Sequence, residues 1–92
     1  MATNITKKEL ENGRVELLVG GELLDADARL VAKLASEAID NGALSVIIDV
    51  ADVDLLDSDS APILRDLERD PRISLRGIEI FLQYAVSEAE RH

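Results

Sequence analysis

The chain of 92 residues is long enough for one domain and too short for a second hydrophobic core. Its 19 acidic residues outnumber 10 lysines and arginines, and the net charge of −9 disfavours nucleic acids and anionic membrane surfaces as partners. Cysteine is absent, which excludes disulfides and thiolate metal sites, and no apolar run is long enough to span a membrane. We therefore expect a soluble, cytoplasmic protein suited to a basic protein partner or to self-association.

The first 23 residues predict a β-hairpin. Asn12-Gly13 is a strong signal for a tight turn between two strands. Val15, Leu17 and Val19 alternate with other residues after it, which predicts a strand over 14–20. A weaker partner strand is expected before the turn, over 4–10, and the glycine pair that follows residue 19 should end the second strand.

A helix and a central strand are expected next. Apolar residues recur at helical spacing over 26–40, with Asp25 or Asp27 as the cap of the first turn and Asn41-Gly42 as the stop. The run 44–50 (LSVIIDV) is almost continuously apolar and rich in β-branched residues. Such a run is typical of a central strand that is buried on both faces.

The second half of the chain predicts a shorter helix and one more strand. Ile63, Leu64 and Leu67 have helical spacing, and Pro71 closes that helix. The segment 78–83 (IEIFLQ) is expected to be a strand, followed by a short terminal helix or a frayed tail. The expected order is β-β-α-β-α-β-α. We predict a single α/β domain over 1–92, with a small mixed sheet of about four strands covered by helices.

The most unusual stretch is 53–62 (VDLLDSDSAP), where acids and serines crowd the exit of the central strand. A nucleophilic serine needs a neighbouring base, yet the only histidine is His92 and no G-x-S-x-G elbow is present. We therefore expect no enzyme activity and no cofactor. Several aspartates could supply oxygen ligands for a divalent ion, but none of them can be the first residue of an EF-hand loop, because the residues that follow do not have the required spacing. The acids in question are Asp49, Asp52, Asp54, Asp57 and Asp59.

Two interpretations of this stretch remain open from the residues alone. Asp57, Ser58, Asp59 and Ser60 are all favoured at the N-cap of a helix, and Pro62 is tolerated in the first turn. A serine at a helix N-terminus can also accept a phosphate, because the helix dipole and the free N–H groups favour an anion there. Capping and phosphorylation predict the same sequence.

Residues 14–84 resemble the STAS domain, the module found in anti-sigma factor antagonists and in the tails of sulfate transporters. The resemblance rests on Gly21-Glu22-Leu23 at a strand end, Gly42 before the central strand, VIIDV within it, and Leu56-Asp57-Ser58 before the next helix. It implies a non-catalytic partner switch in which Ser58 is phosphorylated. The implied partners are an anti-sigma factor or serine kinase of the histidine-kinase-like ATPase type and a serine phosphatase. The implied partner-binding residues are Glu22, Asp25, Asp57, Asp59 and Ser60.

The sequence departs from the family pattern at two places in this site. The usual G-E-L-D is G-E-L-L-D here, so its acid is lost at Leu24 or displaced to Asp25. Asp59 and Ser60 replace the hydroxyl residue and glycine that usually follow the phosphorylated serine. The chain also ends soon after IEIFLQ, so the family's last helix is shortened. Two alternatives follow: a STAS-like scaffold or transport-associated subunit in which Ser58 only caps, and a divalent-ion sensor that uses the aspartates.

Overall fold

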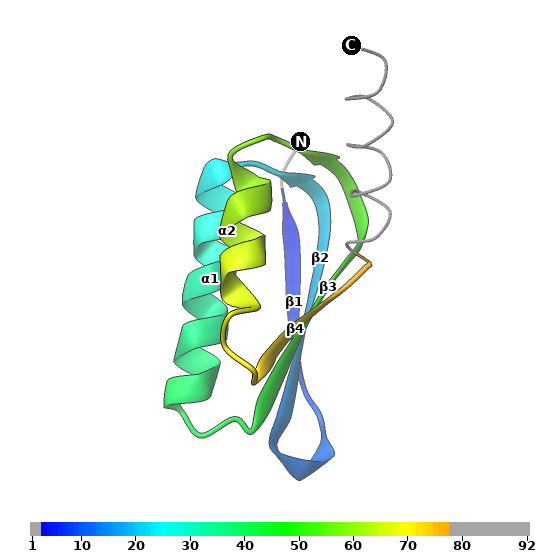
Figure 1. The fold of residues 1–92 in the computed structure, drawn as a ribbon. Coiled ribbons are helices and arrows are strands. Elements are labelled where there is room, and N and C mark those ends of the chain that lie inside the picture. Colours follow the sequence, from blue (N-terminus) through cyan, green and yellow to red (C-terminus); the bar gives the residue numbers. More distant parts are fainter. Residues whose placement is uncertain (1–2, 78–92) are drawn as a thin grey trace.

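The sheet and its helices alternate along the chain in the computed structural model, which describes residues 3–77 (Figure 1). Four strands form one mixed sheet in the order β1-β2-β3-β4. Strand β2 pairs antiparallel with β1 and parallel with β3, and β3 pairs parallel with β4. The elements are β1 (Asn4–Glu9), η1 (Glu11–Gly13), β2 (Arg14–Leu23), α1 (Asp25–Asp40), β3 (Ser45–Leu56), α2 (Ser60–Leu67) and β4 (Ile73–Arg76).

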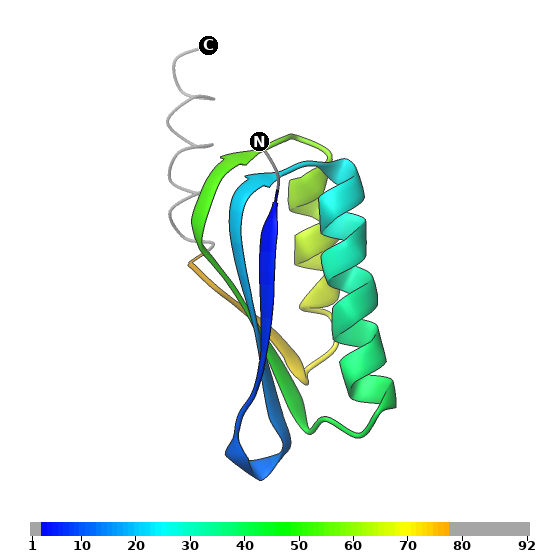
Figure 2. The same ribbon diagram turned by 180° about the vertical axis from the view of Figure 1, so that it is seen from behind.

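Both helices cover the same face of the sheet, as the two opposite views show (Figures 1 and 2). Alternate side chains of the strands point to this face, because successive residues of a strand face opposite ways. They form an aliphatic core with the buried residues of α1 and α2. The opposite face, called the open face below, carries no helix among residues 3–77. The core residues are Val15, Leu17, Val19, Leu23, Val31, Ala35, Ala38, Val46, Ile48, Val50, Val53, Leu64 and Ile73.

The expected hairpin and first helix are confirmed, but the expected strand end at Gly20-Gly21 is wrong, because both glycines pair with β3 and β2 continues to Leu23. Asn12 and Gly13 have φ angles of 68° and 74°, which suits the tight connection between β1 and β2. Helix α1 begins at Asp25, and the carboxylate of Asp27 accepts the N–H of Leu24 at 3.1 Å, which makes Asp27 the residue that caps the first turn. The helix ends at Asp40, before Asn41 and Gly42, as expected. No helix in residues 3–77 is long and apolar enough to cross a bilayer.

The expectation that the central strand is buried on both faces is wrong. Val46, Ile48 and Val50 are buried, whereas the residues between them are half exposed. The reason is that α1 and α2 lie on one face only. The strand also continues to Leu56 instead of ending at residue 50, so much of the acidic stretch belongs to the sheet.

The last described strand, β4, lies at Ile73–Arg76, where the sequence predicted no element. It has only four residues, with Ile73 and Leu75 directed to the core. The strand expected over 78–83 and the terminal helix or tail lie outside the described residues. The observed order β-β-α-β-α-β agrees with the predicted α/β architecture.

Candidate functional site

The candidate site is the link 57–59 between β3 and α2. Strands β2 and β3 are parallel, and each is followed by a helix. The carboxyl ends of both strands and the N-termini of both helices therefore meet at one end of the sheet, at the top of Figure 1. This placement brings Asp25 beside Asp57, although 32 positions separate them in the sequence.

Asp57 holds the two helix N-termini together. Its Oδ2 accepts the backbone N–H of Asp25 at 3.2 Å, and its Oδ1 accepts the backbone N–H of Ser60 at 2.8 Å. The hydroxyl of Ser60 lies 2.5 Å from the same Oδ1. Among the four predicted capping residues, Asp57 therefore satisfies the free N–H groups that a helix N-terminus leaves without a partner.

The hydrogen bonds that Asp57 accepts lower its pKa below the ordinary value of 3.8. The largest cause is the hydroxyl of Ser60, and backbone N–H groups of Ser60, Asp25 and Asp59 act in the same direction, while burial opposes them. Each of these donors stabilises the charged carboxylate over the protonated acid. Asp57 is thus an anionic anchor for both helix N-termini.

Ser60 is fully buried. Its Oγ lies 3.0 Å from the carbonyl oxygen of Leu23 as well as 2.5 Å from Asp57 Oδ1. A hydroxyl has one proton, so the two acceptors share a single donor. Ser60 joins the end of β2 to the start of α2, and it has no exposed surface for a partner to contact.

Ser58 and Asp59 are exposed. Asp59 occupies the N-cap position of α2, but its side chain makes no capping hydrogen bond. The Ser58 hydroxyl makes no hydrogen bond to any residue within 3–77. Capping, which was one of the two interpretations of this stretch, is performed by Asp57 and leaves the Ser58 hydroxyl available.

The remaining expected partner-binding residues lie at the same end of the sheet. Glu22 is the penultimate residue of β2, and its carbonyl oxygen accepts the hydroxyl of Thr3. Asp25 is the first residue of α1 and forms a 2.8 Å ion pair with Arg29. Glu22 and Asp25 therefore lie at the same end of the sheet as the link, in which Asp57 and Asp59 flank Ser58.

The aspartates of this region do not converge on a metal. Among residues 3–77, no group of three or more carboxylate or histidine side chains is arranged to hold a metal ion. Asp57 is directed to the helix N-termini, whereas Asp52 and Asp54 line a hollow of the open face. The hypothesis of a divalent-ion sensor gains no support from this arrangement.

The lowered pKa of Asp57 gives a prediction about acid stability. The folded chain binds the proton of this group less tightly than the unfolded chain does. The stabilisation is therefore fully present well above the ordinary pKa of 3.8, and it is lost as the pH falls through the lowered pKa of the folded chain. Asp70 adds to the same trend, because the side chain and backbone of Arg72 lower its pKa to about 2. Urea unfolding at a series of pH values from about 6 down to about 2 should show a steady loss of stability.

Two variants test the source of this acid dependence. Asp57→Asn should reduce the loss of stability on acidification, because the amide does not titrate. Ser60→Ala keeps the carboxylate but removes its strongest donor, so it should also reduce the pH dependence while lowering stability at neutral pH. If the free energy of unfolding of both variants falls with pH as steeply as that of the parent protein, Asp57 does not contribute to the acid dependence.

The mixed four-stranded sheet with both helices on one face matches the STAS fold. Several solved structures are similar to this chain, and three of them are anti-sigma factor antagonists. SpoIIAA in its unphosphorylated form is 20% identical, with a TM-score of 0.59 over 78% of this chain and 71% of that chain. A STAS-domain antagonist from Rhodobacter sphaeroides is also 20% identical, with a TM-score of 0.62 over 84% and 88%. An antagonist from Mycobacterium paratuberculosis is 14% identical, with a TM-score of 0.67 over 98% and 81%.

The TM-scores show a shared fold, whereas identities of 14–20% say nothing about the partners of this chain. No protein-family model matches the sequence, and no curated protein matches it. The predicted resemblance to STAS domains is thus confirmed at the level of structure.

Proposed function

We propose that this protein is a non-catalytic, cytoplasmic partner-switching regulator of the anti-sigma factor antagonist type. It binds an anti-sigma factor or serine kinase of the histidine-kinase-like ATPase type, and phosphorylation of Ser58 controls the binding. A serine phosphatase reverses the modification. The observation that carries the proposal is the exposed Ser58 hydroxyl at the N-terminus of α2, directly after the residue that fixes the link.

The charge around Ser58 explains how a phosphate would act there. A phosphoserine carries about −1.5 to −2 charges at neutral pH, and it would stand between the carboxylates of Asp57 and Asp59. Burying this group in an interface costs desolvation energy unless the partner supplies cations for it. Phosphorylation should therefore dissociate a partner that contacts the unmodified link closely, while the fold stays held by Asp57 and Ser60.

Phosphorylation is tested with the candidate kinase, ATP and Mg²⁺, followed by intact mass. We expect one phosphate on the parent protein and none on Ser58→Ala. Partner affinity is then measured by calorimetric titration. Ser58→Asp should weaken binding at least about tenfold, because it introduces a buried unpaired charge. Ser36→Asp is the matched control, since Ser36 is an exposed serine in the C-terminal half of α1.

A second candidate function is a STAS-like scaffold or transport-associated subunit without a phosphoswitch. The observation in its favour is the buried contact of Ser60 with Asp57 and Leu23, at the position where the family pattern has a glycine. In that case, Ser58→Asp would bind the partner as tightly as Ser36→Asp does. The same outcome, together with an unmodified Ser58, would refute the partner switch.

A further inference from the structure

The open face of the sheet is hollowed where β2 and β3 approach their carboxyl ends. The hollow has a volume of about 620 Å³ and is bounded on one side by residues of β1. We call it the β2–β3 hollow, and its defining residues are Leu18, Gly20, Gly21, Asp52, Asp54 and Leu55. Ser58 is not among the residues that line it.

Two irregularities in the pairing of β2 with β3 create this hollow. Leu18 pairs with Asp49 but Gly20 pairs with Asp52, so β3 has one extra residue there. A second extra residue occurs between Val53 and Leu55, which pair with consecutive residues of β2. Each such bulge interrupts the alternation of a strand and redirects side chains.

The bulges explain which side chains reach the open face. After Val50, the buried residues of β3 are no longer spaced by two: Val53 is buried, and the pairs on either side of it are exposed. Asp52, Asp54 and Leu55 are therefore all directed outward. Gly20 and Gly21 also line the hollow, and they have no side chains to fill it.

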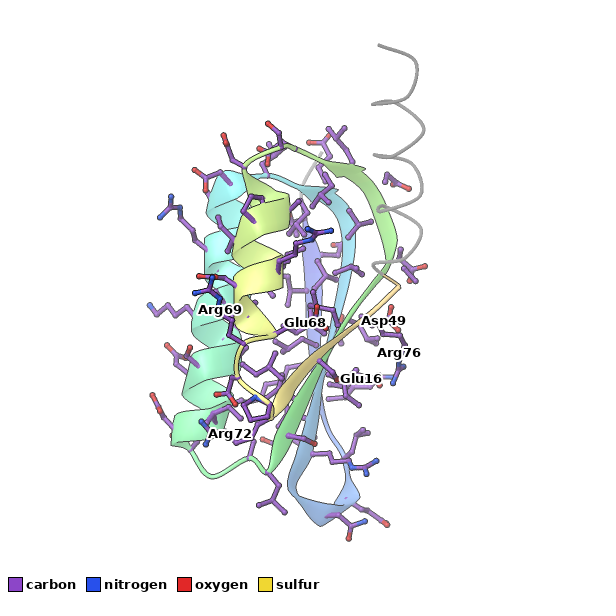
Figure 3. The ribbon with its side chains drawn as sticks, in the orientation of Figure 1. Glu16, Asp49, Glu68, Arg69, Arg72 and Arg76 are labelled. Carbon is purple, nitrogen blue, oxygen red and sulfur yellow. The ribbon has the colours of Figure 1, made fainter. Side chains whose placement is uncertain are left out.

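The hollow is acidic and partly apolar. Asp52 and Asp54 form no ion pair with any residue in 3–77, whereas Asp49 at the lower rim lies 3.5 Å from Arg76. Figure 3 shows Asp49, Arg76 and Glu16 on the side of the sheet away from the helices. Leu55 is 51% exposed beside these carboxylates, a high value for a leucine within a strand.

We propose that the β2–β3 hollow is a docking site for a segment of a protein partner in which lysine or arginine side chains flank an apolar residue. The cations complement Asp52 and Asp54, and the apolar residue covers Leu18 and Leu55. The volume of the hollow lies within the range of about 300–1,000 Å³ that is common for ligand sites, so a few side chains of a partner can enter it. The net charge of −9 favours the approach of a basic partner over a long range. This site is separate from Ser58 and binds whether or not Ser58 is modified.

The test uses the full chain and a fluorescein-labelled heptapeptide that alternates arginine with leucine. Fluorescence anisotropy should show saturable binding that weakens as the salt concentration rises. A heptapeptide that alternates glutamate with leucine should not bind. Backbone amide shifts in NMR spectra should change most at Gly20, Gly21 and Leu55.

Variants assign the binding to the hollow. Asp52→Asn combined with Asp54→Asn should weaken binding about tenfold, the sum of two ordinary surface ion pairs. Glu37→Gln combined with Glu68→Gln removes two exposed carboxylates elsewhere and should have little effect. Gly20→Leu should fill the hollow without removing charge, because a Cβ there meets Asp52 only at ordinary contact distances. Ser58→Ala should bind as the parent protein does.

Four outcomes would overturn the proposal. The first is an equal loss in the two paired variants, which would indicate attraction to the overall charge. The second is unchanged binding in Gly20→Leu. The third is a dimer that Gly20→Leu dissociates in analytical ultracentrifugation, since the occupant would then be a second copy. The fourth is a set of NMR contacts in the free protein between residues 78–92 and Leu18 or Leu55, since the chain would then fill its own hollow.

Discussion

Replacing Leu64 with alanine should lower the free energy of unfolding by about 2–5 kcal/mol, the range for a buried leucine truncated in a tight core. Leu64 is fully buried, and it is one of two buried residues in α2, the other being Ser60. With only eight residues, α2 cannot be stable by itself, because isolated helices shorter than about 12–15 residues are marginal in water. Its position on the sheet therefore depends on this side chain. Urea unfolding followed by circular dichroism measures the loss.

The matched control is Leu30→Ala on α1. Leu30 is 46% exposed, so truncation removes little buried surface and should change stability by less than about 0.5 kcal/mol. Hydrogen exchange gives a second measurement. The Ser60 N–H donates to the carboxylate of Asp57, and its exchange should become faster if α2 is loosened. Similar losses for Leu64→Ala and Leu30→Ala would show that α2 is held by other contacts.

The elements that could be predicted from the sequence are those with local signals. Asn12-Gly13 specifies a turn through the conformations that these two residues adopt easily, and the hairpin forms there. The first helix was expected over 26–40 and is observed at Asp25–Asp40. Its ends are set by Asp27 and by Asn41-Gly42, which act on neighbouring backbone groups. Such signals need no information about the rest of the chain.

The second half of β3 could not be predicted in the same way. Its alternation is interrupted after Val50 by bulges, and these depend on pairing with Gly20 and Gly21, about thirty residues earlier in the sequence. Periodicity therefore indicated an end at residue 50, and the acids that follow looked like a loop. The strand carries Asp52 and Asp54 onto the open face instead.

The candidate site shows the same limit. Four consecutive residues have the propensity to cap a helix, and the sequence alone does not choose among them. The choice depends on the N–H of Asp25 and the carbonyl of Leu23, which the fold brings to the link from far away in the chain. Asp57 becomes the cap, Ser60 becomes its buried donor, and Ser58 is left exposed. The resemblance to STAS domains predicted a role for Ser58, and the contacts leave its hydroxyl exposed and without a hydrogen bond to residues 3–77.

Replacing Gly77 with alanine should lower the free energy of unfolding by about 2–4 kcal/mol, because two unfavourable terms add. Gly77 follows β4 directly and has a φ of +87°, in the left-handed region that other residues rarely adopt. A Cβ atom at this position would also lie 2.7 Å from the backbone nitrogen of Ala51. Ala51 stands at the first bulge of β3, so the new methyl group would push the end of β4 away from it.

Gly42→Ala separates these two terms. Gly42 also has a positive φ, +101°, but a Cβ atom there would meet nothing within 4 Å. Gly42→Ala should therefore lower the free energy of unfolding by about 1–2 kcal/mol, from backbone strain alone. In Gly77→Ala, adding Ala51→Gly should restore little, because that change removes the Cβ of Ala51 and leaves its backbone nitrogen in place. Equal losses for Gly77→Ala and Gly42→Ala in urea unfolding would mean that the end of β4 moves freely, and that the close approach to β3 does not hold it.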